Sequence, residues 1–163
     1  PEMKSTGEVM GIDTTFGAAF AKAEIGAGTV LPTGGAAFIS VQDADKDAVG
    51  PVAKRLAEAG FRLVATRGTA AFLESLGLTV DTVNKVAEGS PHIVDFLRKG
   101  QIAMVINTPI GHGPNLDSFE IRRSALELRV PYFTTAAAAE AAAEAILRLE
   151  AGGLNVKPQQ EYY

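Results

Sequence analysis

The sequence lacks cysteine and tryptophan and has two histidines among its 163 residues. These absences exclude disulfide scaffolds, cysteine nucleophiles, thiolate zinc sites and three-histidine metal sites. Acidic residues outnumber basic residues by 19 to 15, whereas a nucleic-acid-binding protein is expected to carry a basic excess. No apolar run reaches the roughly 18 residues of a membrane span, and no secretory signal pattern opens the chain. We therefore expect one domain that has no metal, nucleic acid or membrane as a partner, and a cytoplasmic location.

Short apolar segments alternate with segments of helical period along most of the chain. The predicted strands are 36–41, 61–66, 78–83, 102–106 and 130–134. The predicted helices are 14–26, 45–59, 70–76, 90–100, 117–129 and 135–151, the last of them rich in alanine. Such alternation is typical of a parallel sheet with helices on both faces. The fold prediction is therefore a three-layer α/β/α domain with a five-stranded, mainly parallel sheet.

Local signals add finer predictions about the helix ends. Ser90 and Pro91 have the pattern of an N-cap followed by proline at the first helical position. Gly50-Pro51 indicates either a kink in the second helix or a helix that starts at Pro51. The period of 117–129 directs Leu128 inward.

Polar residues follow nearly every predicted strand. The set consists of Ser40 with Lys46 beyond it, the turn Thr66-Arg67-Gly68-Thr69, Asn84-Lys85, Asn107-Thr108 and Thr134-Thr135. Ligands of open α/β sheets gather outside the carboxyl ends of the strands. Hydroxyls, amides and lysines suit a phosphate, and no nucleophile–base pair is evident among these residues. In the turn, Gly68 permits close approach of the backbone and Thr69 is a candidate cap of a helix N-terminus that attracts anions.

Lys46 strengthens the phosphate hypothesis. It lies near a helix start, where a cation opposes the helix dipole, and a local rule broken at a ligand-facing position indicates function. A solvated surface lysine remains the alternative, and the same alternative applies to Lys85. His92, expected as the second residue of a helix, and His112, in a glycine-rich loop, lack metal-ligand spacing and an evident carboxylate to orient them.

Several motifs together resemble a known family. The run KSTGEVMGIDTTFGAAFAKAEIGAG resembles the segment that ends the second catalytic half of the carbamoyl-phosphate synthetase large subunit. The rest resembles the C-terminal regulatory domain of that subunit, which has the methylglyoxal-synthase-like fold. The matching motifs are SVQDADK, ATRGTA, VNKVAEGSPHI, INTP and IRRSALELRVPYFTT. On this resemblance, residues 1–35 are the tail of an upstream catalytic domain with the first helix and linker, 36–151 the regulatory domain and 152–163 a C-terminal tail. A chain that starts with Pro1 is then expected to be part of a longer protein.

The resemblance implies a domain that performs no chemistry and binds nucleotide effectors, with UMP as inhibitor and IMP as activator. The implied phosphate-binding residues are Lys46, Thr66, Gly68, Thr69 and Lys85. Ser40, Asn107 and Thr108 match other positions around the nucleotide, and Thr134 matches a residue of an ornithine site. The implied partners are the catalytic remainder of the large subunit, the glutaminase small subunit and a second copy of the domain. The parent protein would use ATP with magnesium or manganese to make carbamoyl phosphate for pyrimidine and arginine synthesis, whereas this segment needs no cofactor or metal.

Some positions depart from the family pattern. Pro109, His112 and Gly113 stand where the best-known members have a hydroxyl and basic residues, which bears on recognition of base and ribose more than of phosphate. The alternative function is a methylglyoxal-synthase-type lyase acting on dihydroxyacetone phosphate. That family needs a carboxylate base in a Gly-Gly-Asp-Gln-like segment after the third strand, and Glu88 is the only acid in the corresponding segment of this chain.

Overall fold

The computed structural model describes residues 9–108, 116–152 and 159–162. The helices are α1 (Phe16–Gly26), α2 (Lys46–Glu58), α3 (Arg67–Ser75), α4 (Ile93–Arg98), α5 (Leu116–Glu127) and α6 (Ala136–Glu150). The strands are β1 (Ala36–Ser40), β2 (Arg62–Ala65), β3 (Val80–Thr82), β4 (Met104–Asn107) and β5 (Tyr132–Phe133). Three short 3₁₀ turns complete the described elements: η1 (Asp43–Asp45), η2 (Val86–Glu88) and η3 (Gln159–Tyr162).

The five strands form one sheet in the order β3-β2-β1-β4-β5, and every pairing is parallel. The predicted three-layer α/β fold is confirmed. The chain moves from β1 outward to β3 and then returns to the other side of β1 with β4. The carboxyl ends of β1 and β4 therefore mark the topological switch point, where open α/β sheets hold their ligands.

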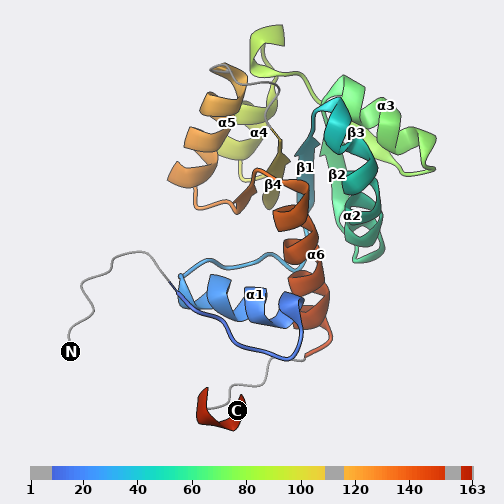
Figure 1. Ribbon diagram of the computed structural model, residues 1–163. Helices are drawn as coiled ribbons and strands as arrows, with labels where there is room; N and C mark the ends of the chain where they lie inside the picture. The colour runs from blue at the N-terminus through green and yellow to red at the C-terminus, as the bar shows by residue number, and fades with distance from the viewer. Residues whose placement is uncertain (1–8, 109–115, 153–158, 163) are drawn as a thin grey trace.

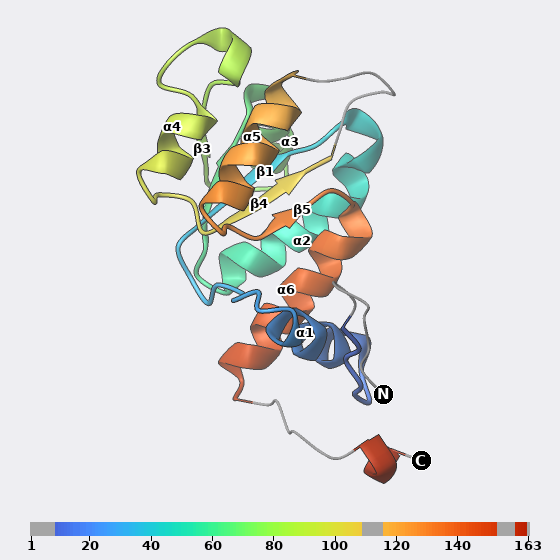
Figure 2. The same ribbon diagram turned by 90° about the vertical axis from the view of Figure 1, so that its left-hand side faces the viewer.

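Alternate residues of each central strand pack into two separate hydrophobic cores, because successive side chains point to opposite faces of a sheet. Ala37 and Ile39 of β1 belong to the core shared with α2, α3 and α6, and Phe38 belongs to the core under α4 and α5. Figures 1 and 2 show these two helical layers on either side of the sheet. Burial on both faces explains why these strands are continuous apolar runs.

The first helix lies outside the sheet layers. It packs against α6, as Figure 1 shows, and Ala21 of α1 joins the larger core. The Thr15 hydroxyl caps α1 by accepting a hydrogen bond from the N–H of Ala18. Within the part of the chain that the structure describes, no helix combines the length and the hydropathy needed to cross a bilayer.

Three local predictions are settled by the structure. The helix α2 runs from Lys46 through Pro51, so it does not start at the proline. The predicted N-cap at Ser90 is wrong: His92 is the cap, and the cis Ser90–Pro91 peptide precedes the helix. His92 is extended there, and its N–H donates to the Asp95 carboxylate, which supplies the cap from inside the helix.

The inward placement of Leu128 is also wrong. Its side chain is 44% exposed because α5 ends at Glu127 and Arg129 adopts a left-handed conformation, which takes the following residues off the helical period.

Candidate functional site

The carboxyl ends of the central strands surround a depression that we call the strand-end hollow. Its outer part, about 170 Å³ in volume, lies between the start of α2 and the start of α3. Its inner part reaches toward α5, and the two parts share Ser40, Thr66 and Lys85. The predicted residues that line the hollow are Ser40, Lys46, Thr66, Gly68, Thr69, Lys85, Asn107 and Thr108. The structure thus brings all of the predicted site residues together except Thr134, whereas Arg67, Asn84 and Thr135 of the wider strand-end set do not line the hollow.

Buried polar side chains concentrate at this hollow. Five polar residues are buried among the described residues, and four of them are Thr66, Thr69, Asn107 and Thr108, each 2–4% exposed. Burial of a polar group costs free energy unless it is hydrogen-bonded, so a cluster of them needs an explanation. Part of this cluster is hydrogen-bonded within the fold, and its place at the ligand-facing edge of the sheet marks a candidate site for a polar ligand.

Hydrogen bonds fix the loop after β1 against neighbouring elements. The N–H of Val41 donates to the Thr69 hydroxyl over 3.1 Å, and the N–H of Gln42 donates to the Thr108 hydroxyl over 3.0 Å. The hydroxyls of Ser40 and Thr66 lie 3.2 Å apart. These bonds hold six of the lining residues in place before any ligand arrives.

The start of α3 faces the hollow with free donors. Thr66 is the N-cap, but its side chain makes no cap hydrogen bond. The expected capping role of Thr69 is wrong, because Thr69 is the third residue of the helix and its hydroxyl is used by Val41. The first N–H groups of a helix have no partner within the helix and favour anions. Gly68 adds open space, since a Cβ built there would meet nothing within 4 Å.

Two lysines supply positive charge. Lys46 is the first residue of α2, and its ammonium lies 2.7 Å from a carboxylate oxygen of Asp43. The Asp43 side chain is 94% exposed, so it can turn into solvent when an anion takes its place at Lys46. The hydrogen bond and charge of Lys46 lower the pKa of the Asp43 carboxyl. Lys85 reaches the hollow from the turn after β3, and its N–H donates to the Glu88 carboxylate over 2.7 Å.

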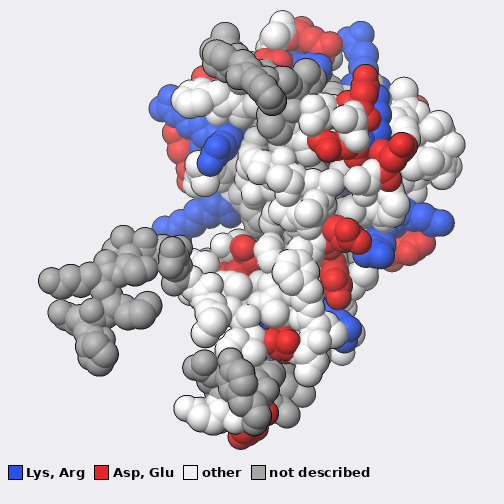
Figure 3. Space-filling view, viewed as in Figure 1, with Lys and Arg blue, Asp and Glu red and all other residues white. Residues whose placement is uncertain are grey.

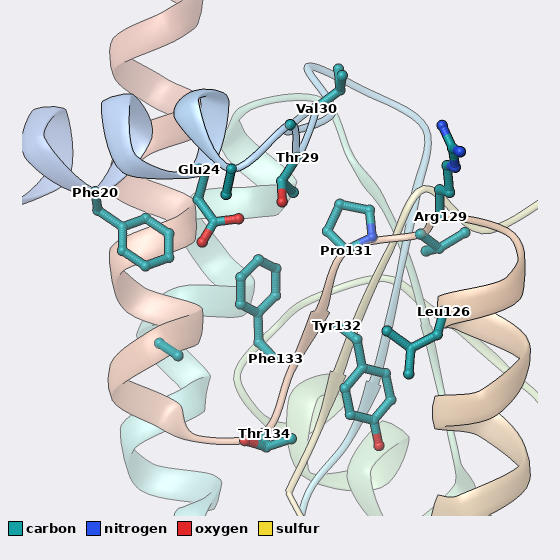
Figure 4. A pocket seen from close by; sticks show the side chains of 14 residues that line it. Phe20, Glu24, Thr29, Val30, Leu126, Arg129, Pro131, Tyr132, Phe133 and Thr134 are labelled. Carbon is teal, nitrogen blue, oxygen red and sulfur yellow. The ribbon is translucent and has the colours of Figure 1, made fainter. Parts of the chain in front are cut away.

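Thr134 lines a different pocket, which we call the β5 pocket. This pocket has a volume of about 790 Å³ and lies between α1, the end of α5 and the edge strand β5. Figure 4 shows Phe20 and Glu24 from α1 and Thr134 from the end of β5 among its walls. Sequence reasoning placed Thr134 correctly after a strand but did not show that its strand lies at the sheet edge.

Several lining residues were not predicted. Asp117 and Ser118 of α5 line the inner hollow, and the Asp117 carboxylate accepts a hydrogen bond from the N–H of Ala87 in η2. Tyr132 accepts a hydrogen bond from the side-chain amide of Asn107 over 2.8 Å. An acid in the first turn of α5 was a detectable signal, whereas the link between Tyr132 and Asn107 spans 25 residues and leaves no local pattern.

Neither histidine joins a constellation in the described residues. His92 lies at the start of α4, with its Nδ1 buried, unpartnered and 3.6 Å from the Asp95 carboxylate. His112, like Pro109 and Gly113, lies outside the described residues. In the described ranges, no group of three or more His, Asp or Glu side chains could hold a metal ion.

A family model described as "MGS-like domain" matches residues 48–134, which is more than half of the chain and includes most of the strand-end hollow. The chain belongs to the MGS-like domain family. Its solved structural neighbours include methylglyoxal synthase from Elizabethkingia anophelis NUHP1, with a TM-score of 0.54 and 24% identity. That likeness covers 68% of this chain and 77% of the neighbour, and it concerns the fold alone.

Curated relatives of this MGS-like domain are carbamoyl phosphate synthase chains. The domain is 50% identical over 163 residues to the large chain from Mesorhizobium japonicum, covering all of this chain and 14% of the relative. It is 53% identical over 157 residues to the "large chain, C-terminal section" from Methanopyrus kandleri, covering 96% of this chain and 29% of the relative. The resemblance drawn from the motifs is confirmed, and the MGS-like domain spans a minor part of the relatives that it matches.

Proposed function

We propose that this chain is the regulatory domain of a carbamoyl phosphate synthase large chain and binds a nucleoside monophosphate, UMP or IMP, in the strand-end hollow. The observation that supports this proposal most strongly is the cluster of buried hydroxyl and amide side chains in the strand-end hollow. Two lysines and the start of α3, which has no side-chain cap, lie beside this cluster. The hydroxyls of Ser40 and Thr66 and the first N–H groups of α3 can donate to an anion, and the lysines add charge.

The phosphate is assigned to the outer part of the hollow. Lys46, the first N–H groups of α3 and the open space at Gly68 meet there. Lys85 and Thr66 line both parts, and we therefore assign them to contacts near the junction of phosphate and nucleoside. Asn107 and Thr108 of the inner part then face the ribose or base.

The β5 pocket and α1 are proposed to meet the rest of a longer chain. The relatives are several times longer than this chain, so the domain has a large covalent neighbour in them. Apolar side chains are exposed on and around α1, namely Val9, Met10, Phe16, Ile25 and Val30. Figure 3 shows a lower surface, around α1, that carries few charged side chains. We assign this surface to contact with the catalytic remainder, and Thr134 to an ornithine site completed by it.

Regulation in this proposal is a coupling between the hollow and that contact. An effector that binds one arrangement of the two parts better than the other shifts their equilibrium, and couplings of about 1–3 kcal/mol are sufficient. The glutaminase small subunit, ATP, its metal ion and the cytoplasmic location belong to the parent protein in this proposal.

The lyase alternative has less support. The segment after β3 contains one acid, Glu88, and its carboxylate accepts the N–H of Lys85 over 2.7 Å. That bond closes the η2 turn, so the carboxylate has a structural role. We therefore do not assign it as a catalytic base.

Titration calorimetry of this chain with UMP, IMP and inorganic phosphate tests the proposal. The substitution Lys46→Met removes a charged donor, and such donors contribute about 1.5–3 kcal/mol, so UMP affinity should fall roughly 10-fold or more. Lys54→Met is the matched control, because Lys54 is an exposed lysine of the same helix outside the hollow. A folded sample that gives no heat with either nucleotide at millimolar concentration overturns the assignment.

A further inference from the structure

One side chain connects the β5 pocket with a residue of the strand-end hollow. Tyr132, the first residue of β5, lines the β5 pocket with its ring. Figure 4 shows its hydroxyl end directed away from Pro131. That hydroxyl lies 2.8 Å from the side-chain nitrogen of Asn107, which lines the strand-end hollow. Tyr132 is therefore a physical link between the edge of the sheet and the switch point.

The link controls which atom of Asn107 the hollow presents. The Asn107 side-chain nitrogen donates to Tyr132 and also to the Ser118 hydroxyl over 3.2 Å. A primary amide has two N–H groups, so both donors are in use. Its carbonyl oxygen accepts no hydrogen bond among the described residues and is not one of their buried unpartnered atoms. The oxygen is thus the part of the amide that remains open to a ligand.

Burial holds the Asn107 side chain between these two hydroxyls. Asn107 is 4% exposed, so its amide nitrogen keeps the Tyr132 and Ser118 oxygens as acceptors without competition from bulk water. Burial raises the pKa of the Tyr132 hydroxyl and the bond from Asn107 opposes that rise, which fits a neutral phenol that accepts from the amide.

We propose that Tyr132 is a positioning residue for the ligand of the strand-end hollow: it orients Asn107 so that the amide carbonyl accepts an N–H or O–H of the nucleoside part. The ligand class that fits is a nucleoside monophosphate, whose ribose O–H or base N–H can donate to this oxygen. Inorganic phosphate, held in the outer hollow, does not reach this amide. The inference rests on the proposed function and deepens it, because it names the group that reads the nucleoside.

The test compares two probes in the same chain, UMP and inorganic phosphate. Tyr132→Phe removes the hydroxyl and keeps the ring, so the amide loses one of its two fixed acceptors. One hydrogen bond contributes about 0.5–1.5 kcal/mol, so UMP affinity should fall roughly 3-fold to 10-fold. Phosphate affinity should stay within about 2-fold, because Lys46 and the α3 start are unchanged. Ser75→Ala, which removes an exposed hydroxyl at the end of α3 outside the hollow, is the control and should leave both affinities unchanged.

A second readout follows the amide itself. The side-chain ¹⁵N–H₂ resonances of Asn107 should shift when UMP is added and remain in place when phosphate is added. A general change in the protein structure would alter the affinities for both UMP and phosphate. If Tyr132→Phe fails to fold, Ser118→Ala carries the same test, since it removes the other acceptor of the amide.

The outcomes separate the two claims. Equal loss of UMP and phosphate affinity in Tyr132→Phe, or no loss of either, overturns the positioning role and leaves the proposed function in place. A wild-type chain that binds neither probe overturns the proposed function and this inference with it.

Discussion

The main-chain N–H of Val41 donates a hydrogen bond to the side-chain hydroxyl of Thr69 over 3.1 Å. The bond joins the loop after β1 to the first turn of α3, and both residues line the strand-end hollow. Because Thr69 is 2% exposed, water does not compete for this bond. The Thr69 hydroxyl is thus engaged in a hydrogen bond within the fold. A bound phosphate would instead contact the main-chain N–H groups at the start of α3.

We predict that Thr69→Val destabilises the chain by about 1–3 kcal/mol. Valine has nearly the same shape, but it leaves the buried N–H of Val41 without an acceptor. Thr69→Ser keeps the hydroxyl and should cost less than Thr69→Val, since it loses one buried methyl group. Urea denaturation of the three proteins measures the difference. Equal stability of Thr69→Val and the wild type would show that the hydrogen bond contributes nothing.

A second prediction concerns the ion pair of Lys46 with Asp43. The carboxylate lies 2.7 Å from the ammonium and competes with any anion for it. Asp43→Asn removes the competing charge and should raise UMP affinity modestly, about 2-fold to 5-fold at low salt, since exposed ion pairs are weak. The gain should shrink with added salt because exposed charges are screened.

The control for this substitution is Asp47→Asn, which removes an exposed acid from the same helix start outside the hollow. Calorimetry at two ionic strengths measures both proteins. A fall in affinity for Asp43→Asn would mean that the carboxylate positions Lys46 rather than competing with the ligand.

The third prediction is a pH dependence of stability at the start of α4. The N–H of His92 donates to the Asp95 carboxylate over 2.9 Å and the Ser90 hydroxyl donates to it over 2.7 Å. These bonds lower the pKa of Asp95 below its ordinary value of 3.8, the His92 N–H having the larger effect. A carboxyl whose pKa is lower in the folded state stabilises the fold above the unfolded value, and the stabilisation is lost as the pH falls through the folded pKa.

Asp95→Asn should therefore be less stable than the wild type at pH 7 and pH 5. The difference should decrease as the pH falls below about 4, because the wild-type carboxyl then also becomes neutral. Urea denaturation across this range measures it, with the exposed acid Glu74 changed to glutamine as the control. A difference that stays constant down to pH 2 would contradict the role of the charge.

Sequence reasoning succeeded where the physics is local and repetitive. The buried strands are short apolar runs because both faces of the sheet are covered, and the six long helices follow the 3.6-residue period. It failed at helix starts. Ser90-Pro91 matches a common N-terminal pattern, yet the carboxylate of Asp95 supplies the cap from within α4. The helix α3 begins at Arg67, three residues before the predicted start, with Thr66 as its extended N-cap.

The candidate site could be predicted in part for a related reason. Parallel strands end at one edge, so the residues that follow them gather without further information, as Ser40 and Asn107 do in adjacent register positions. Side chains that support the site from other elements leave no such signal. Ser118 and Tyr132 contact Asn107 from α5 and from the edge strand, and those contacts depend on packing that the sequence does not display.

The last prediction concerns Gly68 and distinguishes an effect on stability from an effect on ligand binding. This glycine is the second residue of α3, has no positive φ and would place a Cβ in open space. Glycine costs a helix about 0.5–1 kcal/mol relative to alanine, so Gly68→Ala should raise the stability of the free chain or leave it unchanged.

The open space beside Gly68 is the outer hollow, which the added methyl group narrows next to the N–H groups that would hold the phosphate. Phosphate and UMP affinities should therefore both fall, about 10-fold, in a protein at least as stable as the wild type, measured by calorimetry beside urea denaturation. Unchanged affinity in a stabilised variant would place the anion elsewhere on the sheet edge, whereas reduced affinity with gained stability means that the glycine is retained for the ligand.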